Sequence, residues 1–125
     1  MKGVLRKEGI KRIERIRKRG EFEEIFRSAK RVNRENLRVY YALNKRNISR
    51  FAVVTGRKLG KAVLRNRLKR IIREIYRRNK SVFGNGVDWI FIPKGKWEVV
   101  NYSYIERILL DVINGIEERN RIKNR

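Results

Sequence analysis

Residues 56–78 read GRKLGKAVLRNRLKRIIREIYRR, a dense basic stretch that contains a single acid, Glu74, and keeps a helical apolar stripe. On a helix, its apolar residues fall in one arc, the width expected of a core-facing stripe: Leu64, Leu68, Ile71, Ile72 and Ile75. The opposite arc holds Asn66, Lys69, Arg70, Arg73 and Arg77, with Arg65 and Arg67 on its flanks. The stretch therefore predicts a helix over 61–78 that packs on one side and is cationic on the other.

This cationic side has two interpretations, a solvated helix face or a contact with nucleic acid. A solvated face normally mixes Glu with Lys, because opposite charges four residues apart attract. Here like charges stand four apart, as at Lys69 and Arg73. That repulsion disappears when a polyanion lies across the helix, so the pattern favours nucleic acid.

The composition supports the same partner. The chain has 35 Lys and Arg against 13 Asp and Glu, a formal net charge of +22 on 125 residues, and a pI near 11.3. A hydrophobic fraction of 41% is enough for a core, so we expect one folded domain over 1–125. We expect a basic N-terminal extension at 1–14 and a charged tail at 117–125. No apolar run approaches the ~20 residues of a membrane span, and no signal peptide is evident.

The remaining patterns give the order of elements. They predict a basic arm at 1–20 that becomes helical or orders on binding, followed by a helix at 21–29. Two strands at 37–43 and 51–55 are expected to form a hairpin before the basic helix. A buried strand at 87–92 and a last helix that begins at a capping box over 103–106 complete the order. Helices and strands in this order predict an α+β fold in which helices pack on a small sheet.

A catalytic site is hard to build from these residues. The chain lacks Cys and His, its acids form no metal-like cluster, and no serine stands beside a plausible base. Asp88, alone in an apolar strand, is better explained by a strand-edge or cap hydrogen bond than by chemistry. We therefore predict no catalytic residue and no metal site. The absence of Cys also fits a reducing cytoplasm.

Three aromatic residues are candidates for stacking on unpaired bases: Phe22, Phe26 and Tyr40. Two phenylalanines four apart on a helix more often pack in a core, and the pattern alone favours that interpretation. Tyr40 differs, because it shares a strand face with Arg38.

The run GRKLGKAVLRNRLKRIIRE at 56–74 closely resembles the signature of the protein subunit of bacterial ribonuclease P, including its Arg-Asn-Arg core at 65–67. Three further segments resemble the first helix, the following strand and the late strand of that family: RIRKRGEFEEIF, LRVYYAL and VDWIFIPK. Two positions depart from the family pattern, since Lys61 stands where Asn is common and Ala52 where Gly is common.

For the fold, the resemblance implies the element order α-β-β-β-α-β-α, with a short extra strand near 31–33. It also implies an unusual left-handed crossover between parallel strands through the basic helix.

For the function, the resemblance implies a partner of a catalytic RNA, which uses Mg2+ to remove the 5′ leader of precursor tRNA. The ribozyme-facing residues would be Arg57, Lys58, Lys61, Arg65, Asn66, Arg67, Lys69, Arg70 and Arg73. The leader-binding cleft would hold Phe22, Phe26, Tyr40, Arg15 and Arg38, against the core interpretation of the phenylalanines. The same resemblance implies a cytoplasmic protein with no membrane partner and no small-molecule substrate.

Four other functions remain open at this point. A ribosomal or RNA-chaperone protein would explain the charge, but it would not selectively enhance 5′ processing. A DNA-binding domain would prefer duplexes, although nothing resembles a helix-turn-helix. A stand-alone nuclease would cut precursor tRNA without added RNA. A membrane-surface protein would bind vesicles through residues 1–20.

Overall fold

The computed structural model describes residues 14–123, with side chains as far as residue 116. The elements are α2 (Arg19–Ser28), β1 (Lys30–Arg34), β2 (Leu37–Leu43), β3 (Arg50–Val53), the 3-10 turn η2 (Arg57–Leu59), α3 (Ala62–Arg78), the single turn α4 (Lys80–Phe83), β4 (Val87–Pro93) and α5 (Tyr102–Lys123). Apart from η2 and α4, this order confirms the predicted α-β-β-β-α-β-α arrangement. Most of the N-terminal extension expected at 1–14 lies outside the described residues.

The four strands form one sheet in the order β1-β2-β4-β3. β1 and β2 pair antiparallel through a tight hairpin, which confirms the extra strand expected near 31–33. The predicted hairpin between 37–43 and 51–55 is wrong, because β4 inserts between β2 and β3 and pairs with both. The pattern located the strands correctly but not their neighbours.

β3 and β4 run parallel, with Arg50 opposite Asp88 and Ala52 opposite Ile90. Parallel neighbours need a crossover, and α3 provides it between them. The parallel pair joined through the basic helix is therefore confirmed. The left hand of the crossover stays a prediction from the resemblance.

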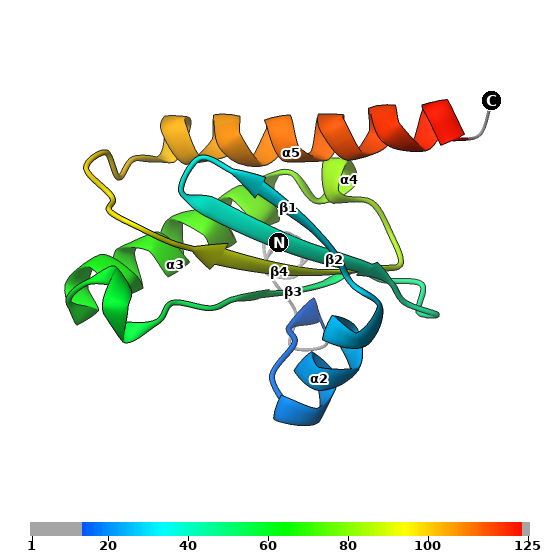
Figure 1. Cartoon of the computed structure of the whole chain (residues 1–125), viewed down its shortest axis with the longest axis horizontal. Coiled ribbons are helices and arrows are strands. Elements are labelled where there is room, and N and C mark those ends of the chain that lie inside the picture. Colours follow the sequence, from blue (N-terminus) through cyan, green and yellow to red (C-terminus); the bar gives the residue numbers. More distant parts are fainter. Residues whose placement is uncertain (1–13, 124–125) are drawn as a thin grey trace, which may run out of the picture.

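The larger core lies between one face of the sheet and the helices α3 and α5 (Figure 1). Alternate residues of each strand point to this face, so Val39, Phe51 and Phe91 are all buried there. The apolar stripe of α3 supplies Leu68, Ile72 and Ile75, all fully buried, as the sequence predicted. Packing α3 this way turns its basic side outward.

Among the described residues, α2 and the segment that leads into it pack on the opposite face of the sheet, and α2 lies across the sheet from α5 (Figure 1). Here Ile25 of α2 packs with Ile16, Ala42, Ala52 and Ile90 in a small second core. Arg38 and Tyr40 of β2 lie half-buried on this same face, and Tyr40 packs against the second core.

Several element ends differ from the predictions. The predicted capping box at the start of α5 is wrong, because Asn101 caps this helix and accepts a hydrogen bond from the Tyr104 N–H at 2.9 Å. The helix then continues to Lys123, through most of the tail expected to fray from residue 117. Most of the arm predicted at 1–20 lies outside the described residues. In the part that the structure describes, Arg15 forms a parallel bridge with Phe51 at the edge of β3, and α2 begins at Arg19.

Candidate nucleic-acid interface

The basic side of α3 contains cations that have no acidic partner among the described side chains. We name as the basic face the predicted set Arg57, Lys58, Lys61, Arg65, Asn66, Arg67, Lys69, Arg70 and Arg73. Most of these side chains are exposed, while Arg65 and Lys69 are half-buried. Within the described part of the chain, the ion pairs on α3 are confined to Glu74 with Arg77 and Arg78. The charges from Arg57 to Arg73 are therefore available to an external anion.

Glu74 sets the C-terminal limit of this face. Hydrogen bonds from Arg77, and then from Arg78, hold the pKa of Glu74 below its usual 4.5. The Arg78 guanidinium also lies over the Tyr102 ring, 5.4 Å from its centroid. Arg77 and Arg78 therefore have internal partners that the residues before them lack.

The connection into α3 brings the first three members of the basic face together. Arg57 and Lys58 lie on η2, and Gly60 then turns the chain with φ +151° and ψ −166°, a conformation essentially restricted to glycine. Lys61 is the N-cap of α3, and its side chain caps nothing. The Asn common at this position in the family could cap the helix, whereas Lys61 offers charge instead.

Arg65 differs from its neighbours in one respect. Its Nε atom is buried without a hydrogen-bond partner, while the residue as a whole is half-buried. A buried, unpaired N–H is costly and calls for a partner.

A continuous aromatic row lies where α2 packs on the sheet. It consists of Phe22 and Phe26 of α2 and Tyr40 of β2. The Phe22 and Phe26 rings lie 6.5 Å apart, and the Phe26 ring meets Tyr40 edge-on at 4.9 Å between centroids. Phe22 and Tyr40 are half-buried, but Phe26 is 43% exposed. The row thus rests on the second core while offering ring surface to solvent, as base stacking requires.

Arginines flank this row on two sides. Arg38 lies two residues before Tyr40 on β2, and its Nε donates to Asn33 Oδ1 at 2.9 Å. On the other side, a hollow of about 270 Å³ is lined by residues that include Arg15, Phe22 and Arg73. The structure therefore joins the aromatic row to the basic face, two sets that the sequence kept separate.

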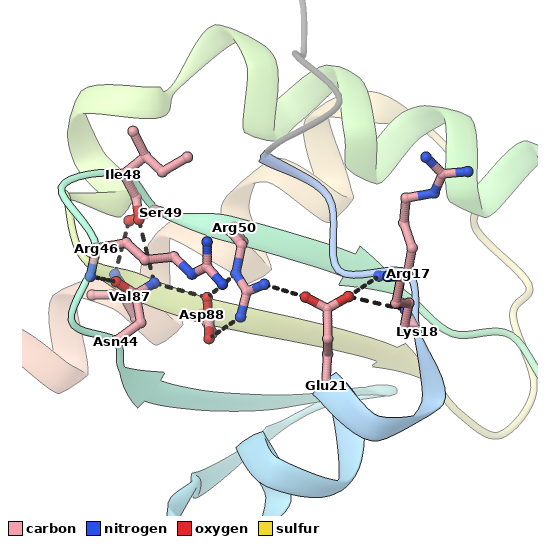
Figure 2. A network of polar contacts seen from close by, with 10 residues as sticks. All are labelled: Arg17, Lys18, Glu21, Asn44, Arg46, Ile48, Ser49, Arg50, Val87 and Asp88. Atoms are coloured by element: carbon pink, nitrogen blue, oxygen red, sulfur yellow. Dashed lines mark hydrogen bonds and ion pairs between the residues drawn. The ribbon is translucent and has the colours of Figure 1, made fainter.

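A network around Arg50 fastens α2 to the sheet, and the sequence did not predict it (Figure 2). The Arg50 guanidinium donates from Nε and Nη2 to the two carboxylate oxygens of Asp88, each at 2.9 Å. Its Nη1 donates to Glu21 Oε2 on α2. The hydrogen bond expected of Asp88 is therefore a buried ion pair, to which Asn44 adds a further donor at 2.8 Å.

Glu21 has two roles at the start of α2. Its Oε1 accepts the backbone N–H groups of Lys18 at 3.1 Å and of Arg17 at 3.4 Å, and its Oε2 accepts from Arg50. The hydrogen bond from Lys18 is the largest cause that lowers the pKa of Glu21 below 4.5, and Arg50 adds to it. The charged carboxylate thus both caps the helix and ties it to β3.

Other features of the described residues carry no binding assignment. A larger, mainly apolar hollow of about 520 Å³ lies between β2, α4 and α5, and none of the predicted site residues lines it. No group of three or more acidic side chains gathers as a metal site between residues 14 and 123. In the same region, no helix has the length and apolar character needed to cross a membrane.

Comparison with known proteins places this geometry in a family. The family model for ribonuclease P matches residues 10–117. The ribonuclease P protein component of Thermotoga maritima is 40% identical, over 88% of this chain and 97% of the relative. That of Petrotoga mobilis is 37% identical, over 86% and 95%.

Solved structures agree with the sequence comparison. The ribonuclease P protein from Thermotoga maritima superposes with a TM-score of 0.73 at 38% identity, covering 80% of this chain and 94% of that one. The Staphylococcus aureus protein superposes with a TM-score of 0.70 at 30% identity, covering 83% and 94%. A sequence match over most of the chain thus accompanies the basic face, the aromatic row and the fold that carries both. The chain belongs to the family of ribonuclease P protein components.

Proposed function

We propose that this protein is the accessory subunit of a ribonuclease P ribonucleoprotein that binds two RNAs at adjoining surfaces. The basic face on η2 and α3 would bind the catalytic RNA, and the aromatic row with Arg15 and Arg38 would hold the single-stranded 5′ leader of precursor tRNA. The proposal places the protein in the cytoplasm with these partners. Its main support is the half-exposed aromatic row beside cations that lack acidic partners among the side chains that the structure describes.

The two surfaces suit different RNA features. Arg and Lys side chains neutralise phosphates and release counterions, whatever the sequence. Aromatic rings stack on unpaired bases, which a leader offers and mature tRNA, lacking that leader, does not. Because the two surfaces meet at the hollow between Phe22 and Arg73, one small protein could bring the leader close to the catalytic RNA.

Cleavage itself is assigned to the RNA partner. In this proposal Mg2+ belongs to that RNA and activates water for hydrolysis of the phosphodiester at the 5′ end of mature tRNA. The protein lowers the repulsion between two polyanions and fixes the leader. This division of labour requires no metal bound to the protein.

Reconstitution tests this division of labour. Cleavage of a 5′-extended precursor tRNA at low Mg2+ is compared for catalytic RNA alone, protein alone and the mixture. We expect activity only in the mixture. Cleavage by protein alone would indicate a stand-alone nuclease. No enhancement, with an RNA proven active at high Mg2+, would favour a ribosomal or RNA-chaperone role.

The leader surface is tested by Phe22→Ala and Tyr40→Ala in the reconstituted complex. Stacking on one base is worth about 1–3 kcal/mol, or roughly 5- to 150-fold in affinity. We expect weaker binding of precursor tRNA and unchanged binding of mature tRNA. Equal weakening for both RNAs would contradict a leader-specific role.

A further inference from the structure

α2 rests on a small apolar contact, so its orientation depends strongly on polar ties. It has ten residues, too few for a stable helix in isolation, and only Ile25 of its side chains is fully buried. The second core beneath it contains Ile16, Ile25, Ala42, Ala52 and Ile90, two of which are alanines. Phe22 and Ala29 of α2 pack against this core but stay partly exposed, so the apolar contact that holds the helix on the sheet is small.

The Arg50 network supplies the missing constraint at the N-terminal end of α2. Arg50 and Asp88 have side chains only 9% and 5% exposed, and their paired geometry fixes the guanidinium in the plane of the carboxylate. The remaining nitrogen, Nη1, is directed to Glu21 of α2 (Figure 2). A rigid donor fixed to β3 and β4 thus determines where the first turn of α2 lies.

Glu21 is the residue immediately before Phe22, which begins the aromatic row. A shift of this first turn therefore moves Phe22 relative to Tyr40, which lies on the sheet itself. We propose that Glu21, held by Arg50, is a positioning residue for leader binding: it sets the spacing between the aromatic side chains of α2 and those of the sheet. This inference rests on the leader-binding function proposed above.

Electrostatics and positioning predict opposite results when the Glu21 charge is removed. Losing a negative charge next to a surface for polyanions should strengthen RNA binding. Losing the tie to Arg50 should weaken leader binding, although the charge has gone. Glu21 is also a better probe than Arg50 or Asp88, because removing either of those leaves a buried charge without its partner.

The experiment measures binding of precursor and mature tRNA by the complex reconstituted with catalytic RNA, using a precursor made resistant to cleavage. Glu21→Gln removes the charge at constant size, and Glu21→Asp keeps the charge but withdraws it from Arg50. Glu23→Gln is the matched control, since Glu23 lies on the same helix and its one ion pair within residues 14–116 is with the exposed Arg19 at 3.2 Å. Binding of each variant to the catalytic RNA, measured separately, reports whether that variant is folded and assembled.

We expect both Glu21 variants to weaken precursor binding about fivefold or more, the lower end of the loss of one stacked base. Binding of mature tRNA should be unchanged, and Glu23→Gln should bind precursor as well as the wild type or better. In a Phe22→Ala background, Glu21→Gln should cause little further loss, since the residue it positions is gone.

The outcomes separate the two proposals. If Phe22→Ala itself fails to weaken precursor selectively, the leader-binding function is wrong. If Phe22→Ala weakens it but both Glu21 variants behave like Glu23→Gln, only the positioning role is wrong. A full additional loss from Glu21→Gln in the Phe22→Ala background would also overturn it. If the Glu21→Gln variant does not assemble with the catalytic RNA, precursor binding by the Glu21→Asp variant decides whether the positioning role is correct.

Discussion

Arg50 lies between two carboxylates, and this arrangement decides how each of them behaves. Asp88 is nearly inaccessible to solvent and receives two of the guanidinium donors, whereas Glu21 is 28% exposed and receives the third. The hydrogen bonds that Arg50 donates to Asp88 are the largest cause that raises the pKa of Arg50 above its usual value. Arg50 therefore stays charged, and the hydrogen bonds that Glu21 accepts from the Lys18 backbone and from Arg50 favour its charged form.

This preference for the charged form gives a prediction for stability against pH. Because its folded-state pKa is lowered, Glu21 contributes stability that is fully present above about pH 4.5 and is lost as the pH falls through the folded-state pKa. Glu21→Gln has no such titration. The difference in urea unfolding free energy between wild type and Glu21→Gln should therefore shrink from about pH 6 to about pH 3.

Glu74 also has a lowered pKa, but it is present in both proteins, so its contribution cancels in that difference. A difference that stays constant over the range would show that the Glu21 carboxylate is not stabilised in its charged form. The same titration should appear in the contribution of α2 to the far-ultraviolet circular dichroism, since Glu21 caps this helix.

The sequence could not reveal the Arg50 network, although it marked one member. Asp88 was conspicuous as a lone acid in an apolar strand, but Arg50 stands 38 positions away and pairs with it only because β3 and β4 are neighbours in the sheet. The members of the aromatic row, by contrast, came from the resemblance, since the helical spacing of Phe22 and Phe26 by itself favoured core packing.

At the scale of elements, the length and periodicity of a segment decided which predictions were correct. α3 has a seventeen-residue pattern with a clear stripe, and its observed bounds agree closely with those predicted. The strand order failed because adjacent strands in sequence usually pair, and the sequence gives no sign that β4 enters between β2 and β3. The start of α5 was misplaced because Ser103 and Asn101 are both acceptable caps.

The turn that leads into α3 gives a prediction at this scale. Gly60 has a backbone conformation essentially restricted to glycine, and an added Cβ would lie 2.8 Å from Leu64 Cδ2. Gly60→Ala should therefore cost about 1–3 kcal/mol of unfolding free energy, mostly backbone strain because the Leu64 side chain can move. Urea denaturation measures this directly.

Gly56, at the other end of η2, is the matched control. Its φ of −80° suits any residue, and an added Cβ would meet nothing within 4 Å. Gly56→Ala should change stability by less than about 1 kcal/mol, in the stabilising direction if its main effect is on the unfolded chain. Equal losses for the two variants would mean that the turn does not require the conformation seen at Gly60.

At the scale of the whole molecule, the formal net charge is +22, and nearby acids neutralise the positive charges in some places but not in others. Near the C-terminal end of α3, Glu74 partly neutralises Arg77 and Arg78. Over the rest of α3, on η2 and beside the aromatic row, cations face solvent. One side chain, Arg73, borders both surfaces, because it lines the same hollow as Phe22 and Arg15. The two proposed RNA partners would therefore meet across this arginine.

The dependence of RNA binding on salt measures which of these charges touch phosphate. Each phosphate neutralised releases counterions, so the slope of log K against log salt changes by roughly 0.7–0.9 for every phosphate that a variant no longer neutralises. Arg70 is exposed on the basic face, whereas Arg78, equally basic and on the same helix, is engaged by Glu74 and Tyr102. For binding to the catalytic RNA, Arg70→Ala should flatten the slope by about one, and Arg78→Ala should leave it nearly unchanged.

Two other results are possible, and each has a distinct physical meaning. Equal flattening by both variants would show that binding responds to net charge alone, because each substitution removes one positive charge from the same helix. An unchanged slope for Arg70→Ala would place the catalytic RNA away from this face, even if affinity fell. A difference between the two therefore requires that the RNA contacts the part of α3 that Glu74 leaves uncompensated, and that the internal pairing of Arg78 persists in the complex.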